Sequence, residues 1–72
     1  MKVTLEQTKK LLMEGDLVFH SLVFSFMVTH LRKLYTKAPS DRALEDCNSA
    51  INTFLDKFKD SMTEDFEIIA KL

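Results

Sequence analysis

The sequence contains very few of the residues that cross-link a small fold or interrupt its helices. Its 72 residues include one cysteine, one glycine, one proline and no tryptophan. A single cysteine excludes an internal disulfide, and one cysteine with two histidines at no recognisable ligand spacing gives no structural zinc site. We therefore expect no metal or other cofactor, and a reducing, cytoplasmic environment.

The sequence also lacks an apolar run long enough to cross a bilayer. The longest uncharged stretch has fifteen residues, between Asp16 and Arg32, and five of them are polar. As a helix with about 1.5 Å rise per residue it covers roughly 22 Å, short of the ~30 Å hydrocarbon core. The first residues, MKVTLEQTKK, show no signal-peptide pattern. We expect no membrane span.

Charge of either sign is not in large excess. The formal net charge is −1, which argues against general attraction to nucleic acid or anionic lipid. The distribution is uneven, since residues 1–37 carry six Lys/Arg against three Asp/Glu, and residues 38–72 carry four against eight. This asymmetry favours packing of the two halves against each other.

The chain does contain one dense apolar segment, Asp16–Lys37. At about 100° per residue, its small and polar residues fall in one narrow arc, and apolar residues fill most of the remaining circumference. The arc consists of Ser21, Ser25, Thr29, Arg32 and Thr36. A helix that is apolar nearly all round is normally buried. We predict a core helix over Asp16–Lys37 that needs cover on at least two sides.

A first helix is predicted before this segment. Thr4 and Gln7 have the spacing of a capping box, which places a helix start at Thr4 and an end near Glu14. Gly15–Asp16 favours a break or sharp bend. The alternative is one continuous helix, which the seven-residue spacing of Leu5, Leu12, Phe19 and Phe26 would suit.

The second half begins after a loop at Pro39 and is predicted to be helical over Asp41–Ser61, with Ser40 or Asp41 as the cap. Its apolar positions form an arc about 140° wide. They are Ala43, Leu44, Cys47, Ala50, Ile51, Phe54, Leu55, Phe58 and Met62. A link this short makes the flanking helices antiparallel neighbours. Asp65 would interrupt the arc of a longer helix, so Glu64–Leu72 is predicted to be a separate short helix.

These elements predict an all-α fold in a single domain, residues 1–72. The fold is a small bundle of three to four helices, in which short flanking helices pack on an antiparallel hairpin of Asp16–Lys37 and Asp41–Ser61. A core of this size is marginal alone. With disulfides and metals excluded, we expect homodimerisation to complete it.

No pattern in the sequence points to catalysis. His20 and His30 lie at the edges of the apolar arc, where pairing with a backbone carbonyl or a carboxylate is the ordinary role. Cys47 lies in the middle of an apolar stripe, where a thiol is an inert filler. We expect the protein not to be an enzyme.

The sequence therefore favours a non-catalytic helical module, a small regulator, inhibitor or adaptor, that binds a protein partner. The candidate interaction residues are Leu17, Ser21, Leu22, Ser25, Phe26, Val28, Thr29, Arg32 and Lys33. The alternative is a small nucleic-acid-binding regulator using Arg32, Lys33 and Lys37. Against a helix-turn-helix, the following helix is expected to turn a phosphate-repelling face outward, formed by Asp41, Glu45, Asp46, Asn48, Asn52 and Asp56.

Overall fold

The computed structural model describes residues 2–14 and 17–72, and within these ranges the regular structure is entirely helical. The elements are α1 (Leu5–Met13), α2 (Leu22–Lys37), α3 (Asp41–Lys57), the 3-10 helix η1 (Lys59–Ser61) and α4 (Thr63–Ala70). The predicted all-α bundle is confirmed, including the separate short helix at the C-terminal end.

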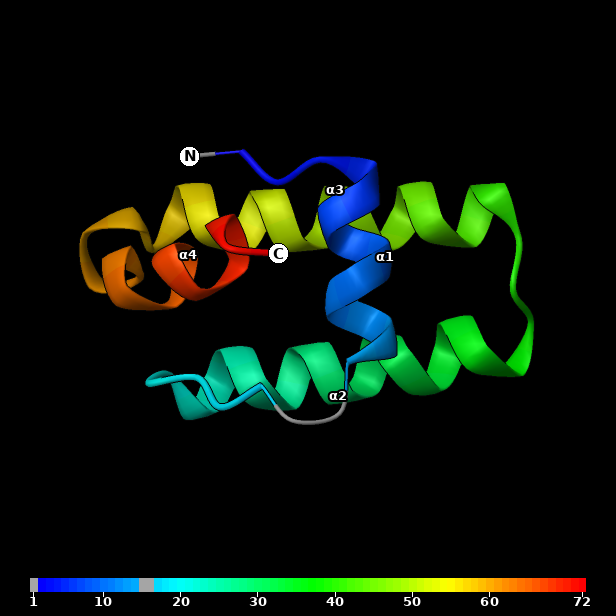
Figure 1. Ribbon diagram of the computed structural model, residues 1–72, viewed down its shortest axis with the longest axis horizontal. Helices are drawn as coiled ribbons and strands as arrows, with labels where there is room; N and C mark the ends of the chain where they lie inside the picture. Colours follow the sequence, from blue (N-terminus) through cyan, green and yellow to red (C-terminus); the bar gives the residue numbers. More distant parts are fainter. Residues whose placement is uncertain (1, 15–16) are drawn as a thin grey trace.

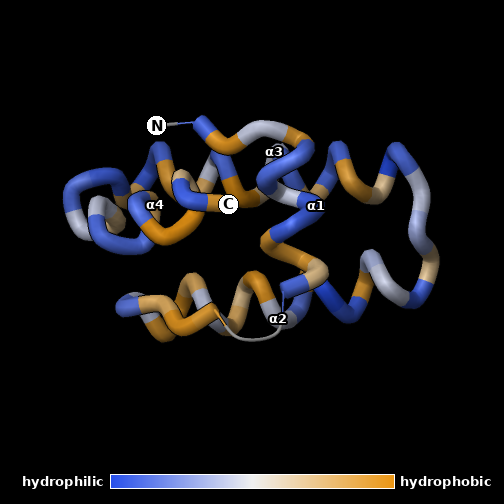
Figure 2. The backbone as a smooth tube through the Cα atoms, in the orientation of Figure 1, coloured by the Kyte–Doolittle hydropathy of each residue, from blue (hydrophilic) through white to orange (hydrophobic). Residues whose placement is uncertain are grey.

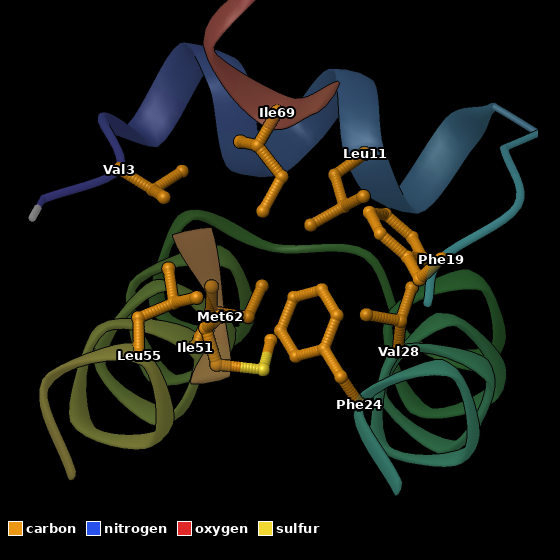
Figure 3. Packing of buried hydrophobic residues seen from close by; sticks show 9 residues of the cluster. All are labelled: Val3, Leu11, Phe19, Phe24, Val28, Ile51, Leu55, Met62 and Ile69. Atoms are coloured by element: carbon orange, nitrogen blue, oxygen red, sulfur yellow. The ribbon is translucent and has the colours of Figure 1, made fainter. Parts of the chain in front are cut away.

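The helices form two layers. Antiparallel α2 and α3 make a hairpin, α1 crosses this hairpin, and α4 lies beside α1 near the end of α3 (Figure 1). Figure 3 shows α1 and α4 on the same side of the hairpin, with the core side chains between the two layers. That core consists of Val3, Leu11, Phe19, Phe24, Val28, Ile51, Leu55, Met62 and Ile69. One face of the hairpin is therefore covered by the other helices.

Two of the helix starts follow from local sequence signals. The Thr4 side chain accepts a hydrogen bond from the Gln7 amide, and the Gln7 side chain accepts one from the Thr4 amide, which confirms the capping box. Ser40 caps α3 by accepting from the Ala43 amide at 3.0 Å. These bonds satisfy amides that have no partner within the helix.

The start of α2 differs from the prediction. Ser21 caps α2 by accepting from the Phe24 amide at 3.2 Å, so the helix begins at Leu22 rather than at Asp16. Residues 17–21 are not helical, and Phe19 lies outside both α1 and α2, so the seven-residue spacing does not mark one continuous helix. The predicted break at Gly15–Asp16 lies outside the described residues. The end of α3 also differs, at Lys57 rather than Ser61.

A buried carboxylate explains where α2 begins. Asp65 is only 1% exposed, and its two oxygens accept hydrogen bonds from the amides of His20 at 2.6 Å and Ser21 at 3.0 Å. Those amides would otherwise lie unpaired at a helix N-terminus, where a negative charge is favourable. The acidic residue that interrupts the apolar arc thus ties α4 to the beginning of α2.

Polar contacts also tie α1 to the hairpin. The Arg32 guanidinium donates to carbonyls at the end of α1, from Nε to Leu12 at 2.8 Å and from Nη2 to Glu14 at 2.5 Å. These carbonyls have no partners within α1, and a cation suits a helix C-terminus.

Two asparagines hold the beginning of the chain against α3, which corrects the prediction that they face solvent. Asn52 accepts from the Val3 amide at 2.6 Å, and Asn48 donates to the Val3 carbonyl at 2.7 Å and to the Thr8 hydroxyl at 2.8 Å. Both asparagines are half-buried. An amide side chain donates and accepts at once, so it can satisfy an extended backbone segment.

Candidate functional site

The first half of α2 exposes large apolar side chains to solvent. Leu22 is 69% exposed and Phe26 is 71% exposed, and a four-residue spacing places them side by side on the helix. We call these two residues the α2 edge. Figure 2 shows the first half of this helix coloured mainly as hydrophobic residues. Val18, in the segment that leads into the helix, is also exposed.

A second apolar surface lies on the hairpin face away from α1. On α2, Val23, Met27 and Leu34 fall within an arc of about 40°, on the side opposite Arg32. Because the Arg32 guanidinium reaches the α1 carbonyls, this arc faces away from α1. Val23 is 64% exposed and Leu34 53% exposed, and Met27 is half-buried.

The neighbouring helix continues this surface with smaller side chains. On α3, Ala43, Ala50 and Phe54 lie roughly opposite Asn48 and Asn52 around the helix. Since the two asparagines point to the beginning of the chain and to α1, the three apolar residues face away from it. All three are half-buried. We call the combined surface the open face, formed by Val23, Met27, Leu34, Ala43, Ala50 and Phe54.

A groove lies at one end of the open face, where the beginning of α2 meets the end of α3. Its volume is about 340 Å³, and its lining is His20, Ser21, Val23, Phe54, Phe58, Ser61 and Met62. The Phe54 and Phe58 rings form its aromatic wall, with their centroids 4.8 Å apart and their planes tilted by 48°. The groove is thus an apolar recess with a polar rim.

The residues predicted for interaction from the sequence divide between exposed and structural positions. Leu22, Phe26, Thr29 and Lys33 are exposed. Val28 is 3% exposed within the core, and half-buried Leu17 packs against that core. Ser21 caps α2, Arg32 binds the end of α1, and Ser25 is half-buried with its carbonyl accepting from the Thr29 hydroxyl. The structure brings the exposed four onto one flank of α2.

The open face itself was not predicted as a binding surface. Its α3 residues belong to the apolar arc that was expected to pack inward. The helical spacing contains a usable signal, because Ala43 and Ala50 lie at one margin of that arc. The spacing does not indicate which edge of the apolar arc α1 and α4 cover.

Within the described residues, His20 and Cys47 have separate partners and lie in different surroundings. His20 Nε2 lies 3.1 Å from the Glu64 carboxylate, and both side chains are exposed. The Cys47 side chain is buried, with Sγ 4.0 Å from the Leu31 carbonyl oxygen. Burial raises the pKa of the Cys47 thiol, and the negative charge of Asp46 raises it further. A neutral, buried thiol is a poor nucleophile.

The basic cluster considered for nucleic acid is divided by the fold. Arg32 is half-buried and its guanidinium is engaged with α1 carbonyls, whereas Lys33 and Lys37 are exposed. A phosphate-binding surface depends on several cations that face the same way. Only Lys33 and Lys37 of this cluster are therefore available to bind phosphate.

Within residues 2–14 and 17–72, no helix combines the length and apolar content needed to cross a membrane, and no cluster of His, Cys, Asp or Glu could hold a metal ion. Comparisons of the chain with protein-family models, with curated proteins and with solved structures found no match.

Proposed function

We propose that this chain is a non-catalytic helical interaction module, a small regulator, inhibitor or adaptor, that binds a protein partner through the α2 edge. The observation that carries the proposal is the solvent exposure of Leu22 and Phe26. Two adjacent apolar side chains of this size on a helix surface are typical anchors for another protein.

The surroundings of the α2 edge support a protein ligand. Thr29, Lys33 and His30 are exposed further along the same helix and give the apolar anchors a polar border. An apolar centre with a polar rim is the usual composition of a protein–protein interface. Phe26 is the strongest candidate for an energetic anchor, because aromatic side chains contribute a disproportionate share of interface energy.

We also propose that the protein is a homodimer whose contact includes α2. The support is the amount of apolar surface that one copy leaves uncovered, on the α2 edge and on the open face together. A second copy could cover part of this apolar surface through a self-complementary patch on a two-fold axis. This is the commonest symmetry of soluble oligomers.

The partner is tested by affinity capture from the host with three forms of the protein. We expect the wild type to retain at least one specific protein that Phe26→Asp loses. Leu5→Asp is the matched control, because Leu5 is 44% exposed on α1, away from the edge, and this variant should behave as wild type. Direct titration of the purified partner then measures the affinity.

The proposal fails if the Phe26→Asp variant is folded by circular dichroism and captures the same proteins as the wild type. A salt-sensitive gel shift with duplex DNA that requires Lys33 and Lys37 would instead favour the nucleic-acid reading, since phosphate binding weakens steeply with salt.

A further inference from the structure

We infer that a second copy of this chain covers the open face, with α2 of each copy lying over α3 of the other. The inference rests on the proposed homodimer and names its interface and arrangement. Two hairpins then stack face to face, with α1 and α4 on the outside of each. The α2 edge stays free, so the dimer presents two partner-binding edges.

The open face has complementary side-chain sizes. The Phe24 and Phe54 ring centroids are 5.5 Å apart, and Cys47 Sγ lies 4.0 Å from the Leu31 carbonyl. These contacts fix the register of the two antiparallel helices along the hairpin axis. Residue 34 of α2 is therefore level with residue 44 of α3, and residue 27 is level with residue 51.

A two-fold axis parallel to the helices of the hairpin leaves positions along the hairpin unchanged. It places α3 of the second copy opposite α2 of the first, in the same register. Leu34 then faces Ala43 of the second copy, and Met27 faces Ala50 of the second copy. Large residues opposite small ones let two helical layers interdigitate. At the end of the hairpin, Val23 faces Phe54 of the second copy beside the two grooves.

The charges of the two helices select the same arrangement. The Arg32 guanidinium is engaged with α1 carbonyls on the opposite side of α2, so the free charges of α2 are the exposed Lys33 and Lys37, and this helix has no acidic residue. α3 carries four acidic residues, Asp41, Glu45, Asp46 and Asp56, against two basic ones, Arg42 and Lys57. Stacking α2 on α2 would bring two positively charged helices together, whereas α2 over α3 places a helix of net positive charge over one of net negative charge.

The area available is enough for a specific but weak dimer. α2 has 16 residues, and at 1.5 Å per residue it is about 24 Å long. Two neighbouring helices, each about 10 Å wide, present roughly 480 Å² per copy. The total of about 1,000 Å² lies at the lower limit for specific interfaces. The dimer should dissociate on dilution and weaken as salt screens the opposite net charges of the two helices.

The first experiment compares two charge insertions on α2 by sedimentation velocity across a range of concentrations. Leu34→Asp should raise the dimer dissociation constant about tenfold or more, the effect of losing one anchoring contact. Phe26→Asp, at a residue that is also exposed but lies on the α2 edge, should leave it unchanged. Circular dichroism checks that both variants fold.

The possible failures of this experiment are distinguishable. A wild type that is monomeric at every concentration would overturn the homodimer and this inference together. A dimer broken by Phe26→Asp and not by Leu34→Asp would keep the proposed homodimer and overturn its assignment to the open face.

The second experiment tests which helix faces which. Leu34→Cys and Ala43→Cys are made separately in a Cys47→Ala background, so that each chain has one thiol. The mixture of the two variants should form disulfide-linked dimers faster than either variant alone, because a disulfide requires Cα atoms within about 7 Å. Faster linking of Leu34→Cys alone, or no linking in the mixture, would overturn the arrangement.

Discussion

The two faces of the α2–α3 hairpin are built from the same helices and differ in how far the rest of the chain covers them. On the covered face, Phe24, Ile51 and Leu55 are completely buried beneath α1 and α4. On the open face, Val23 and Leu34 remain more than half exposed. The covered face also has polar ties that fix its neighbours in place, through Asp65 and Arg32. The apolar content of α2 therefore exceeds what one copy of the fold buries, and we propose that the excess serves association.

The sharpest test of this comparison is to truncate one aliphatic residue on each face. Ile51→Ala should reduce the free energy of unfolding by about 2–5 kcal/mol, because it leaves a cavity in a closed core. Leu34→Ala should change it by about 0.5 kcal/mol or less, as exposed positions do. Urea unfolding at concentrations that keep the protein monomeric measures both. Equal losses would mean that the open face is part of the core.

A second test removes the carboxylate that ties α4 to α2. Asp65→Ala leaves the amides of His20 and Ser21 without their acceptor and should reduce stability by about 1–3 kcal/mol. Amide hydrogen exchange should accelerate at these two residues first. Glu64→Ala is the control, because its carboxylate is 71% exposed and its pairing with His20 should contribute little. A loss no larger than that of the control would contradict the role of Asp65.

A third test loosens α1 from the hairpin. Arg32→Lys keeps the charge but removes the forked donor that reaches two carbonyls of α1, and should reduce stability by about 1 kcal/mol. The neighbouring exposed Lys33, changed to Ala, should give no measurable loss. Thermal melts compare the unfolding midpoints of the two variants with that of the wild type. Similar midpoints would show that the guanidinium contacts do not hold α1.

The smallest expected effect is a pH dependence from Cys47. Burial raises the pKa of this thiol in the folded state, so the folded chain retains a proton that the unfolded chain loses. The stabilisation is complete below the pKa of the unfolded thiol, about 8.5, and is lost as pH rises toward the higher folded pKa. Melts at rising alkaline pH should therefore show a steeper decline for wild type than for Cys47→Ala. Parallel declines would indicate that the thiol makes no contribution.

The parts of the fold that could be predicted are those encoded over a few residues. The Thr4–Gln7 capping box and the Ser40 cap beside Pro39 formed as expected. The apolar stripe of α3 formed only in part, because Ile51 and Leu55 are buried while Phe58 is 42% exposed. The start of α2 could not be predicted in this way. Asp65, which fixes that start, lies 44 residues further along the chain from Ser21. The same limit applies to Asn48 and Asn52, whose partners are at the other end of the chain.

The candidate site was predictable in part for the same physical reason. A helix that is apolar nearly all round must expose something in so short a chain, and Leu22 and Phe26 are indeed exposed. The side of the hairpin that remains open depends on where α1 crosses it, which Arg32 helps to fix through carbonyls about 20 residues earlier. Helical spacing alone therefore predicted that α2 has more apolar surface than the chain can cover. It did not predict which side of the hairpin stays uncovered.

The central claim, that the open face is left for a second copy, is tested most directly by the thermal midpoint as a function of protein concentration. Association binds only the folded chain, so the midpoint should rise steadily over a hundredfold range of concentration, and Leu34→Asp should shift this rise to concentrations about tenfold or more higher. A wild-type midpoint that is the same at every concentration, with a monomeric mass by light scattering in the most concentrated sample, would contradict the claim.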